Sequence, residues 1–171
     1  VVSGGVDPLK GSLDEALLAP SKAHIFGTDK MGRDIFARVI YGARASLTAT
    51  FGVVALIFFI GTTLGVIAGY FGGIADMVIM RFTDMVMSFP YILLVLVAPV
   101  IFRPGLWNII LILGFVDWPG IARLVRGNVL NLRETNFVKG SIVSGMPVRH
   151  ILFSEILPNT VAPILVYATS V

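Results

Sequence analysis

The chain has 171 residues, of which 56% are hydrophobic and only 13% are charged, and its formal net charge is +3. An ordinary soluble domain carries about twice that share of charged residues, so the composition predicts a polytopic, all-α membrane protein. The absence of cysteine excludes disulfides and thiolate chemistry. The basic residues lie in loops beside apolar segments, a placement that predicts no nucleic-acid partner.

Residues 1–32 form a polar N-terminal segment in which glycines and prolines prevent long regular structure. The first 44 residues also lack the basic start, apolar stretch and cleavage site of a signal peptide. Residues 33–46 then follow a helical, amphipathic pattern, with Asp34 and Arg38 at the i,i+4 spacing of an ion pair. We expect either a helix lying in the membrane surface or a solvated lead-in to the first span.

Four apolar stretches predict membrane spans, at about residues 47–70, 85–102, 105–122 and 157–171. The first is uncharged and corresponds to roughly 36 Å of helix, enough to cross a hydrocarbon core of about 30 Å. Because the chain starts at Val1 without a methionine and is still apolar at Val171, we expect a fragment that lacks at least one helix at each end.

Particular residues refine the expected spans. Pro90 is expected to bend or break the second span, and Arg81 with Asp84 at i,i+3 spacing predicts a local ion pair at its edge or, alternatively, a substrate gate. The third span is expected to end near Asp117, with Trp118 at the level of the lipid headgroups. In the first span, glycines at intervals of four predict close packing against a neighbouring helix. These helix-packing residues are Gly61, Gly65 and Gly69.

A long polar connection, residues 123–157, separates the third and fourth spans. Asn136 is placed to cap a short helix over 137–144, and Gly145 to end that helix in a left-handed conformation. Pro147 is placed in the first turn of a second short helix. That helix has Val148, Ile151 and Leu152 on one face. The two short helices together are expected to form either a compact docking feature or interfacial helices that only anchor the loop.

Several short motifs occur together, at His24–Asp34, Tyr41–Arg44, Gly69–Gly73, Met80–Arg81 with Asp84, Ser88–Pro90 and Trp118–Gly127. In combination they resemble the second ("C-type") permease subunit of the dipeptide, oligopeptide and nickel ABC importers, over residues 24–171. The resemblance implies a multi-pass transmembrane domain over residues 33–171 in the inner (cytoplasmic) membrane. It also implies that residues 1–32 lie outside the cytoplasm and the 123–157 loop inside it. Lys and Arg are divided too evenly between the two sides to fix this orientation by themselves.

The family's cytoplasmic loop has the pattern Glu-Ala-Ala-x-x-x-Gly, with Leu-Pro twelve residues after the glycine. Gly145 and Leu157-Pro158 fit this pattern, but the first three positions read Lys139-Gly140-Ser141. An acidic residue is thus replaced by a basic one, and Gly140 weakens the helix by about 1 kcal/mol relative to alanine. The resemblance implies an ATPase-coupling site made of Lys139, Gly140, Ser141, Gly145, Pro147, Leu157 and Pro158.

The resemblance implies transport of peptides, nickel or a similar small solute, with four kinds of partner. These are a second permease subunit, ATPase subunits, an extracytoplasmic solute-binding protein and membrane lipid. The chain has no Gly-x-x-x-x-Gly-Lys-Ser/Thr phosphate loop, so ATP and Mg are expected on the partner ATPase, with no catalytic residue and no cofactor here. Its histidines, His24 and His150, are too far apart in sequence to suggest a metal site.

Two other functions remain open from the sequence. A secondary transporter or channel fragment needs ionisable residues within its spans, and only Asp117 is a candidate. A non-transporting membrane scaffold from a decayed permease gene is compatible with the altered loop.

Overall fold

The computed structural model describes residues 7–102 and 105–168. Residues 1–6, the two residues 103–104 between the expected second and third spans, and the last three residues of the expected fourth span lie outside the described residues. The described chain is helical, as expected of a polytopic membrane protein, and an isolated β-bridge joins Thr28 and Asp34. It divides into two compact units, residues 1–50 and 51–171, which are described separately.

Asp29 organises the N-terminal unit, which also contains the short 3-10 helix η1 (Leu13–Glu15). Its carboxylate accepts hydrogen bonds from the backbone N–H groups of Met31 (2.8 Å) and Arg33 (3.0 Å). It also accepts bonds from the guanidinium groups of Arg33 (2.9 Å) and Arg38. The backbone hydrogen bond from Arg33 is the largest cause that lowers the pKa of Asp29 to about 2. Asp29 is therefore the ionised centre around which this turn closes.

Asp34 caps the first long helix, α1 (Ile35–Phe71). It accepts a 2.7 Å hydrogen bond from the N–H of Ala37, and its other oxygen lies 2.8 Å from Nδ1 of His24. The bond from Ala37 is the first cause of the lowered pKa of Asp34. The expected pairing of Asp34 with Arg38 is wrong, because Arg38 pairs with Asp29 instead.

Helix α1 is continuous over roughly 55 Å, which exceeds the thickness of a hydrocarbon core of about 30 Å. The expected division into a surface helix over 33–46 and a separate span is therefore not found. The stretch between them contains no proline, and the Thr48 hydroxyl donates to the Arg44 carbonyl at 2.8 Å without interrupting the helix. The helix ends at Phe71, and the next two residues, Gly72 and Gly73, turn the chain with φ angles of 64° and 53° that favour glycine.

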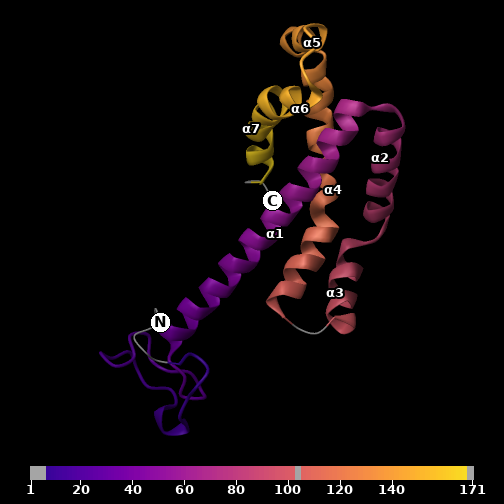
Figure 1. Cartoon of the computed structure of the whole chain (residues 1–171). Coiled ribbons are helices and arrows are strands. Elements are labelled where there is room, and N and C mark those ends of the chain that lie inside the picture. The colour runs from indigo at the N-terminus through magenta and orange to yellow at the C-terminus, as the bar shows by residue number, and fades with distance from the viewer. Residues whose placement is uncertain (1–6, 103–104, 169–171) are drawn as a thin grey trace. The chain divides into compact units, whose positions relative to one another are not determined.

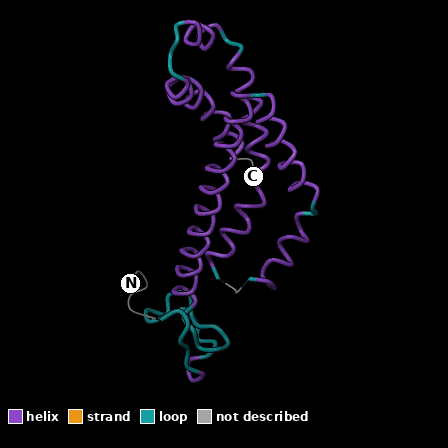
Figure 2. Tube along the Cα trace, turned by 45° about the vertical axis from the view of Figure 1, so that its right-hand side comes forward, coloured by secondary structure: helices purple, strands orange, loops and turns teal. Residues whose placement is uncertain are grey.

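Two further helices, α2 (Gly73–Ser88) and α3 (Tyr91–Ile101), follow this turn. The break expected at Pro90 is confirmed, and the two helices meet there at 72° (Figure 2). Proline has no N–H to donate and its ring clashes with the preceding turn, which explains the break. The expected second span thus consists of α3 and only the last turn of α2.

Helix α4 (Leu106–Arg133) runs alongside α2 and α3 (Figure 1). It contains Pro119 and continues past it, so the helix end expected near Asp117 is not found. Trp118 is 2% exposed and stacks on Phe82 of α2 with ring centroids 5.9 Å apart. Its indole therefore packs between α4 and α2, and its expected position at the level of the headgroups stays a prediction.

The remaining elements are α5 (Asn136–Val143), α6 (Val148–His150), the π-helical segment η2 (Ile151–Ile156) and α7 (Leu157–Ala168). Among the described residues, α1 and α4 are long and apolar enough to cross a membrane, and α2 with α3 adds a third crossing if the bent pair is one span. Large apolar side chains such as Phe51, Phe59 and Ile92 are exposed on these helices. A bilayer provides the apolar surroundings that such surfaces require.

Gly61, Gly65 and Gly69 face α4 at close range. A Cβ atom added at Gly61 would lie 2.7 Å from Cβ of Ile121, and one at Gly65 would lie 2.6 Å from the Ala122 carbonyl oxygen. One at Gly69 would lie 2.8 Å from Cβ of Val129. Real Cβ atoms do not approach other heavy atoms so closely, so the two backbones are in contact only because these side chains are absent.

Ion pairs join α2 to α4 beside this contact. Arg126 donates hydrogen bonds to both carboxylate oxygens of Asp76, from Nε and from Nη2, the latter at 2.6 Å. Nη2 of Arg123 donates to Oδ1 of Asp84 at 2.5 Å. Asp76 also lies in the first turn of α2, where a negative charge is favoured. The expected pair of Asp84 with Arg81 is not found among the described residues, because the partner of Asp84 comes from another helix.

Adding only a methyl group at Gly65 should lower the stability of the α1–α4 contact. Gly65→Ala places a Cβ against the Ala122 carbonyl, and overpacking of this kind costs about 1–3 kcal/mol. We expect the midpoint of thermal unfolding in detergent, followed by the fluorescence of the buried Trp118, to fall by several degrees.

Gly127→Ala is the matched control, because Gly127 is helical and a Cβ there meets nothing within 4 Å. Its midpoint should be unchanged or slightly raised. An equal decrease in both variants would contradict the close contact at Gly65.

The N-terminal unit should lose its order in acid. A carboxylate with a lowered pKa stabilises the fold above its unfolded pKa, and this stability is lost as the pH falls toward the folded value. Because the pKa of Asp29 is about 2 instead of 3.8, pepsin cleavage within residues 7–34 should accelerate as the pH falls from about 4 to about 2.

Asp29→Asn should be cleaved rapidly already at about pH 4, because the amide does not attract both guanidinium groups as an ion. Asp14→Asn alters an exposed aspartate and should leave the profile unchanged. Identical profiles for Asp29→Asn and the wild type would show that Asp29 does not hold the turn.

Candidate functional site

The candidate site is the 123–157 loop, which begins on the last turns of α4. Arg133 donates a 3.0 Å hydrogen bond to the Tyr70 carbonyl at the end of α1, which fixes the base of the loop. Thr135 is the N-cap of α5, whereas the sequence had suggested Asn136, which is the first helical residue. The Thr135 hydroxyl donates to the Leu132 carbonyl at 2.5 Å and so satisfies a carbonyl in the last turn of α4. One short turn therefore connects the two helices.

Lys139 lies at the exposed face of α5 and forms an ion pair with Glu134 at 2.8 Å. The side-chain hydrogen bond from Lys139 is the main cause that lowers the pKa of Glu134. The basic residue at this position thus has an acidic partner within the chain. Gly140, the next residue, has nothing within 4 Å of a Cβ built on it.

Gly145 ends α5 in the left-handed conformation that the sequence predicted, with φ of 72°. Its N–H bonds to the Ile142 carbonyl at 3.0 Å, and the N–H of Met146 bonds to the Ser141 carbonyl at 3.1 Å. These two bonds define a Schellman motif, which satisfies the last carbonyls of the helix. No heavy atom crowds this position, so its need for glycine is conformational and not steric.

The second arm is one continuous helical path and not the short separate helix that was expected. Pro147 is the N-cap of α6, which passes directly into η2 and then into α7. Pro158 explains the π-helical turns, because it has no N–H for the Ser154 carbonyl and disturbs the regular i→i−4 bonding. Leu157 packs against the hydrophobic core, and Pro158 is exposed.

The two arms are attached to each other and to the transmembrane helices. The Ser141 hydroxyl donates a hydrogen bond to Glu155, whose second carboxylate oxygen is buried without a hydrogen-bond partner among the described residues. Val138 of α5 is fully buried. It belongs to a core cluster with Val66, Ile121, Val125, Val129, Ile151, Ile156 and Ile164. Ile151 thus packs inside the chain, so the expected docking face of Val148, Ile151 and Leu152 is not a free surface.

Other apolar side chains of the loop are exposed. They are Phe137, Ile142, Val143, Met146, Val148 and Phe153, and we call them the exposed loop set. Val143 is 88% exposed although it ends a helix whose opposite face is buried. Both views place α5 at the outer end of the loop, beyond the end of α4 (Figures 1 and 2). An exposed apolar set of this kind is typical of a surface that a protein partner covers.

Sequence reasoning placed Gly145 correctly and missed the residues that hold the arms together. Glu155 and Val138 carry no motif, and only the helical spacing of Val138 hinted that it is buried. Among the described residues, no three metal-binding side chains come together. The two arms of the loop continue α4 and α7 and share a hydrophobic core with them.

Comparison with known proteins is consistent with this geometry. The family described as "Binding-protein-dependent transport system inner membrane component" matches residues 61–171. The dipeptide transport system permease protein of Alkalihalophilus pseudofirmus is 46% identical over 90% of this chain and 50% of its own length. That of Bacillus subtilis is 40% identical over 94% of this chain and 50% of its own length. The glutathione transport system permease protein of Pectobacterium atrosepticum is 42% identical over 86% of this chain and 49% of its own length.

The chain spans about half the length of the curated relatives that it matches. The family match covers α4, the complete loop and α7, together with the glycine face of α1. On these grounds the chain belongs to the family of binding-protein-dependent transport system inner membrane components.

Proposed function

We propose that this chain is part of a permease subunit of an ABC importer that carries peptides across the cytoplasmic membrane. The names of the relatives support a peptide substrate, since they include dipeptide, oligopeptide and glutathione systems. A second permease subunit and an extracytoplasmic solute-binding protein would complete the translocation path. ATP and Mg would bind to separate ATPase subunits.

The 123–157 loop is the proposed docking element for an ATPase subunit. The observation that carries this assignment is the exposed loop set on two arms that share a buried core with α4 and α7. Apolar side chains in the centre of an interface favour association, and the exposed Lys139 and Arg149 would lie at its polar rim.

Coupling then follows from the rigidity of the loop. When ATPase subunits close around ATP, the docked α5 would move with them. The hydrogen bond from Ser141 to Glu155 and the core cluster that includes Val138 and Ile151 would pass this movement to η2 and α7. The spans would alternate between outward- and inward-open states, biased by the different affinity of the ATPase for each state.

For the orientation, we propose that residues 1–46 lie outside the cytoplasm and that residues 123–157 lie inside. The proposal counts α1, the bent pair α2–α3 and α4 as three crossings. If the bent pair entered and left the membrane on one side, the two regions would lie on the same side.

Substitution of Gly145 tests the docking assignment. Gly145→Val forces a β-branched residue into a left-handed conformation, which costs about 1 kcal/mol or more and tilts α6 relative to α5. We expect normal amounts of the full-length protein in the membrane, weaker co-purification with the ATPase, and ATP hydrolysis that no longer drives uptake.

Gly145→Asn is the matched control, since it adds a side chain at the same open position but asparagine tolerates the left-handed conformation. It should retain most of the uptake. Full co-purification and full transport in Gly145→Val would show that the loop is a surface anchor and not a docking element.

Single cysteines at Ser12 and Ser144 test the orientation, because both residues are exposed and the chain has no cysteine of its own. A thiol reagent that does not cross membranes should label position 12 in intact cells and label position 144 only after the cells are opened. Labelling of 144 but not 12 would reverse the topology, and labelling of both in intact cells would show that α2–α3 does not cross.

A further inference from the structure

Asp117 lines a cavity that is open to the surface of the helical bundle, since Met87, Phe89 and Tyr91 in its wall are exposed. The cavity has a volume of about 390 Å³ and lies where the break between α2 and α3 faces α4. Its wall is made by the last turn of α2, the residues of the break, the start of α3 and the middle of α4. The lining side chains include Met87, Phe89, Pro90, Tyr91, Asp117 and Pro119.

The depth of Asp117 makes its charge costly. It follows Leu106, the first residue of α4, by roughly 17 Å along the helix and precedes Arg123 by roughly 9 Å. The carboxylate is therefore within the apolar part of α4, where ionisable residues are rare and face cavities or partners. Among the described residues, no lysine or arginine forms an ion pair with it.

The hydroxyl of Tyr91 is the hydrogen-bonding group that faces Asp117. A carboxylate has about four acceptor positions, so one hydroxyl leaves most of them open to a ligand. The C-terminal end of α2 also reaches this cavity through Val86 and Met87, and a helix C-terminus carries partial negative charge. The cavity therefore favours a cation.

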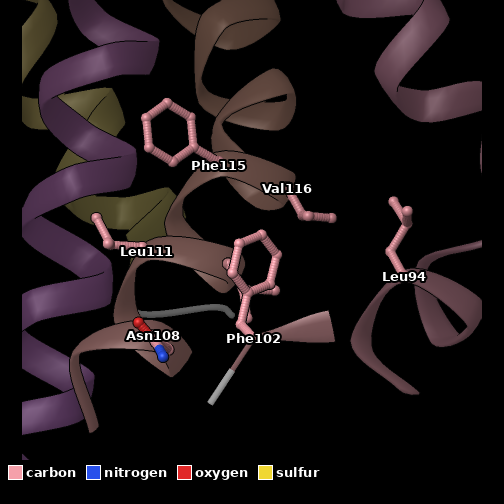
Figure 3. A pocket seen from close by; sticks show the side chains of 7 residues that line it. Leu94, Phe102, Asn108, Leu111, Phe115 and Val116 are labelled. Carbon is pink, nitrogen blue, oxygen red and sulfur yellow. The ribbon is translucent and has the colours of Figure 1, made fainter. Parts of the chain in front are cut away.

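An apolar cavity adjoins the first, and Val116 lines both. It has a volume of about 290 Å³, and its lining includes Leu94, Phe102, Leu111 and Phe115. Figure 3 shows Val116 pointing from α4 toward Leu94 on α3. Pro119 has no N–H, so the Phe115 carbonyl beside this cavity lacks its usual helical donor. A charged position and an apolar position thus lie next to each other on α4.

We propose that Asp117 and Tyr91 bind the protonated amino group of a transported solute, and that its apolar side chain enters the adjoining cavity. An ammonium group offers three donors and one positive charge, which matches a single carboxylate with open acceptor positions. Ca²⁺ or Mg²⁺ would need about six oxygen ligands and a transition metal several carboxylate or imidazole ligands, and among the described residues no three such side chains come together. The proposal rests on the proposed function, since peptides carry such an amino group.

The test uses the complete transporter, purified with its ATPase and second permease subunit. Dicyclohexylcarbodiimide, an apolar reagent for carboxyl groups, should label Asp117, and mass spectrometry of the fragment that contains it measures the extent. Leucyl-alanine at millimolar concentration should lower this labelling about tenfold, because the ammonium group covers the carboxylate. N-acetyl-leucyl-alanine, which lacks the charge, should leave it unchanged.

Asp84 serves as the internal control, because it is exposed and paired with Arg123, and its labelling should not respond to either peptide. Glycyl-alanine should protect Asp117 only at several-fold higher concentration than leucyl-alanine, since it leaves the apolar cavity empty. Equal protection by the acetylated and free peptides, no protection, or no labelling of Asp117 at all would each overturn the proposal.

Uptake assays separate this inference from the proposed function. Asp117→Asn should lower uptake of leucyl-alanine about tenfold, and Asp117→Glu, which keeps the charge, should retain most of it, both with normal ATPase co-purification. Peptide uptake by the wild type that is unaltered in Asp117→Asn would overturn the amine site alone. Absence of peptide uptake in the wild type would overturn the proposed function.

Discussion

The close approach of α1 and α4 is the constraint on which the membrane part of the structure depends. Three glycines at intervals of four remove the side chains that would hold the two backbones apart. In a bilayer the lipid tails are as apolar as the side chains, so close van der Waals packing has to replace the hydrophobic effect as the cause of association. Val66 beside these glycines, with Ile121, Val125 and Val129 opposite, extends the contact into the core.

Helix α4 is consequently the common support of the other elements. One of its faces meets the glycines of α1, another holds α2 through Arg123 and Arg126, and its end continues into the 123–157 loop. The bidentate pair of Arg126 with Asp76 lies close to the level at which the loop begins. Each neighbour contacts α4 by a different kind of interaction. Since all of them share this one helix, a displacement of the loop would act on all of them through it.

Periodicity and local rules predicted much of this arrangement. The spacing of Gly61, Gly65 and Gly69 indicated the face that meets α4, Pro90 indicated a break, and Gly145 indicated a left-handed helix end. Each of these depends on backbone sterics within a few residues, which a single sequence contains.

The errors concern partners that are distant in sequence. Asp84 pairs with Arg123 and not with Arg81, and Arg38 pairs with Asp29 and not with Asp34. The third span was expected to end near Asp117 and Trp118, yet α4 continues past Pro119 and the ring of Trp118 packs against Phe82. In the loop, the bond of Ser141 to Glu155 joins residues whose proximity follows only from the return of the second arm. Spacing alone does not reveal such contacts.

The π-helical segment η2 gives the second arm a property that an unbroken α-helix lacks. Its wider turns hold an extra residue relative to the α-helical register, and they lie between the α5–α6 turn and α7. Moving this extra residue along the chain would give each residue that it passes a screw displacement of about 100° and about 1.5 Å, and would leave the residues beyond it unchanged. Such a screw motion requires only a few hydrogen bonds to exchange acceptors. A π-helical turn that moved from η2 into α7 would therefore change which side chains the first residues of α7 present to their neighbours.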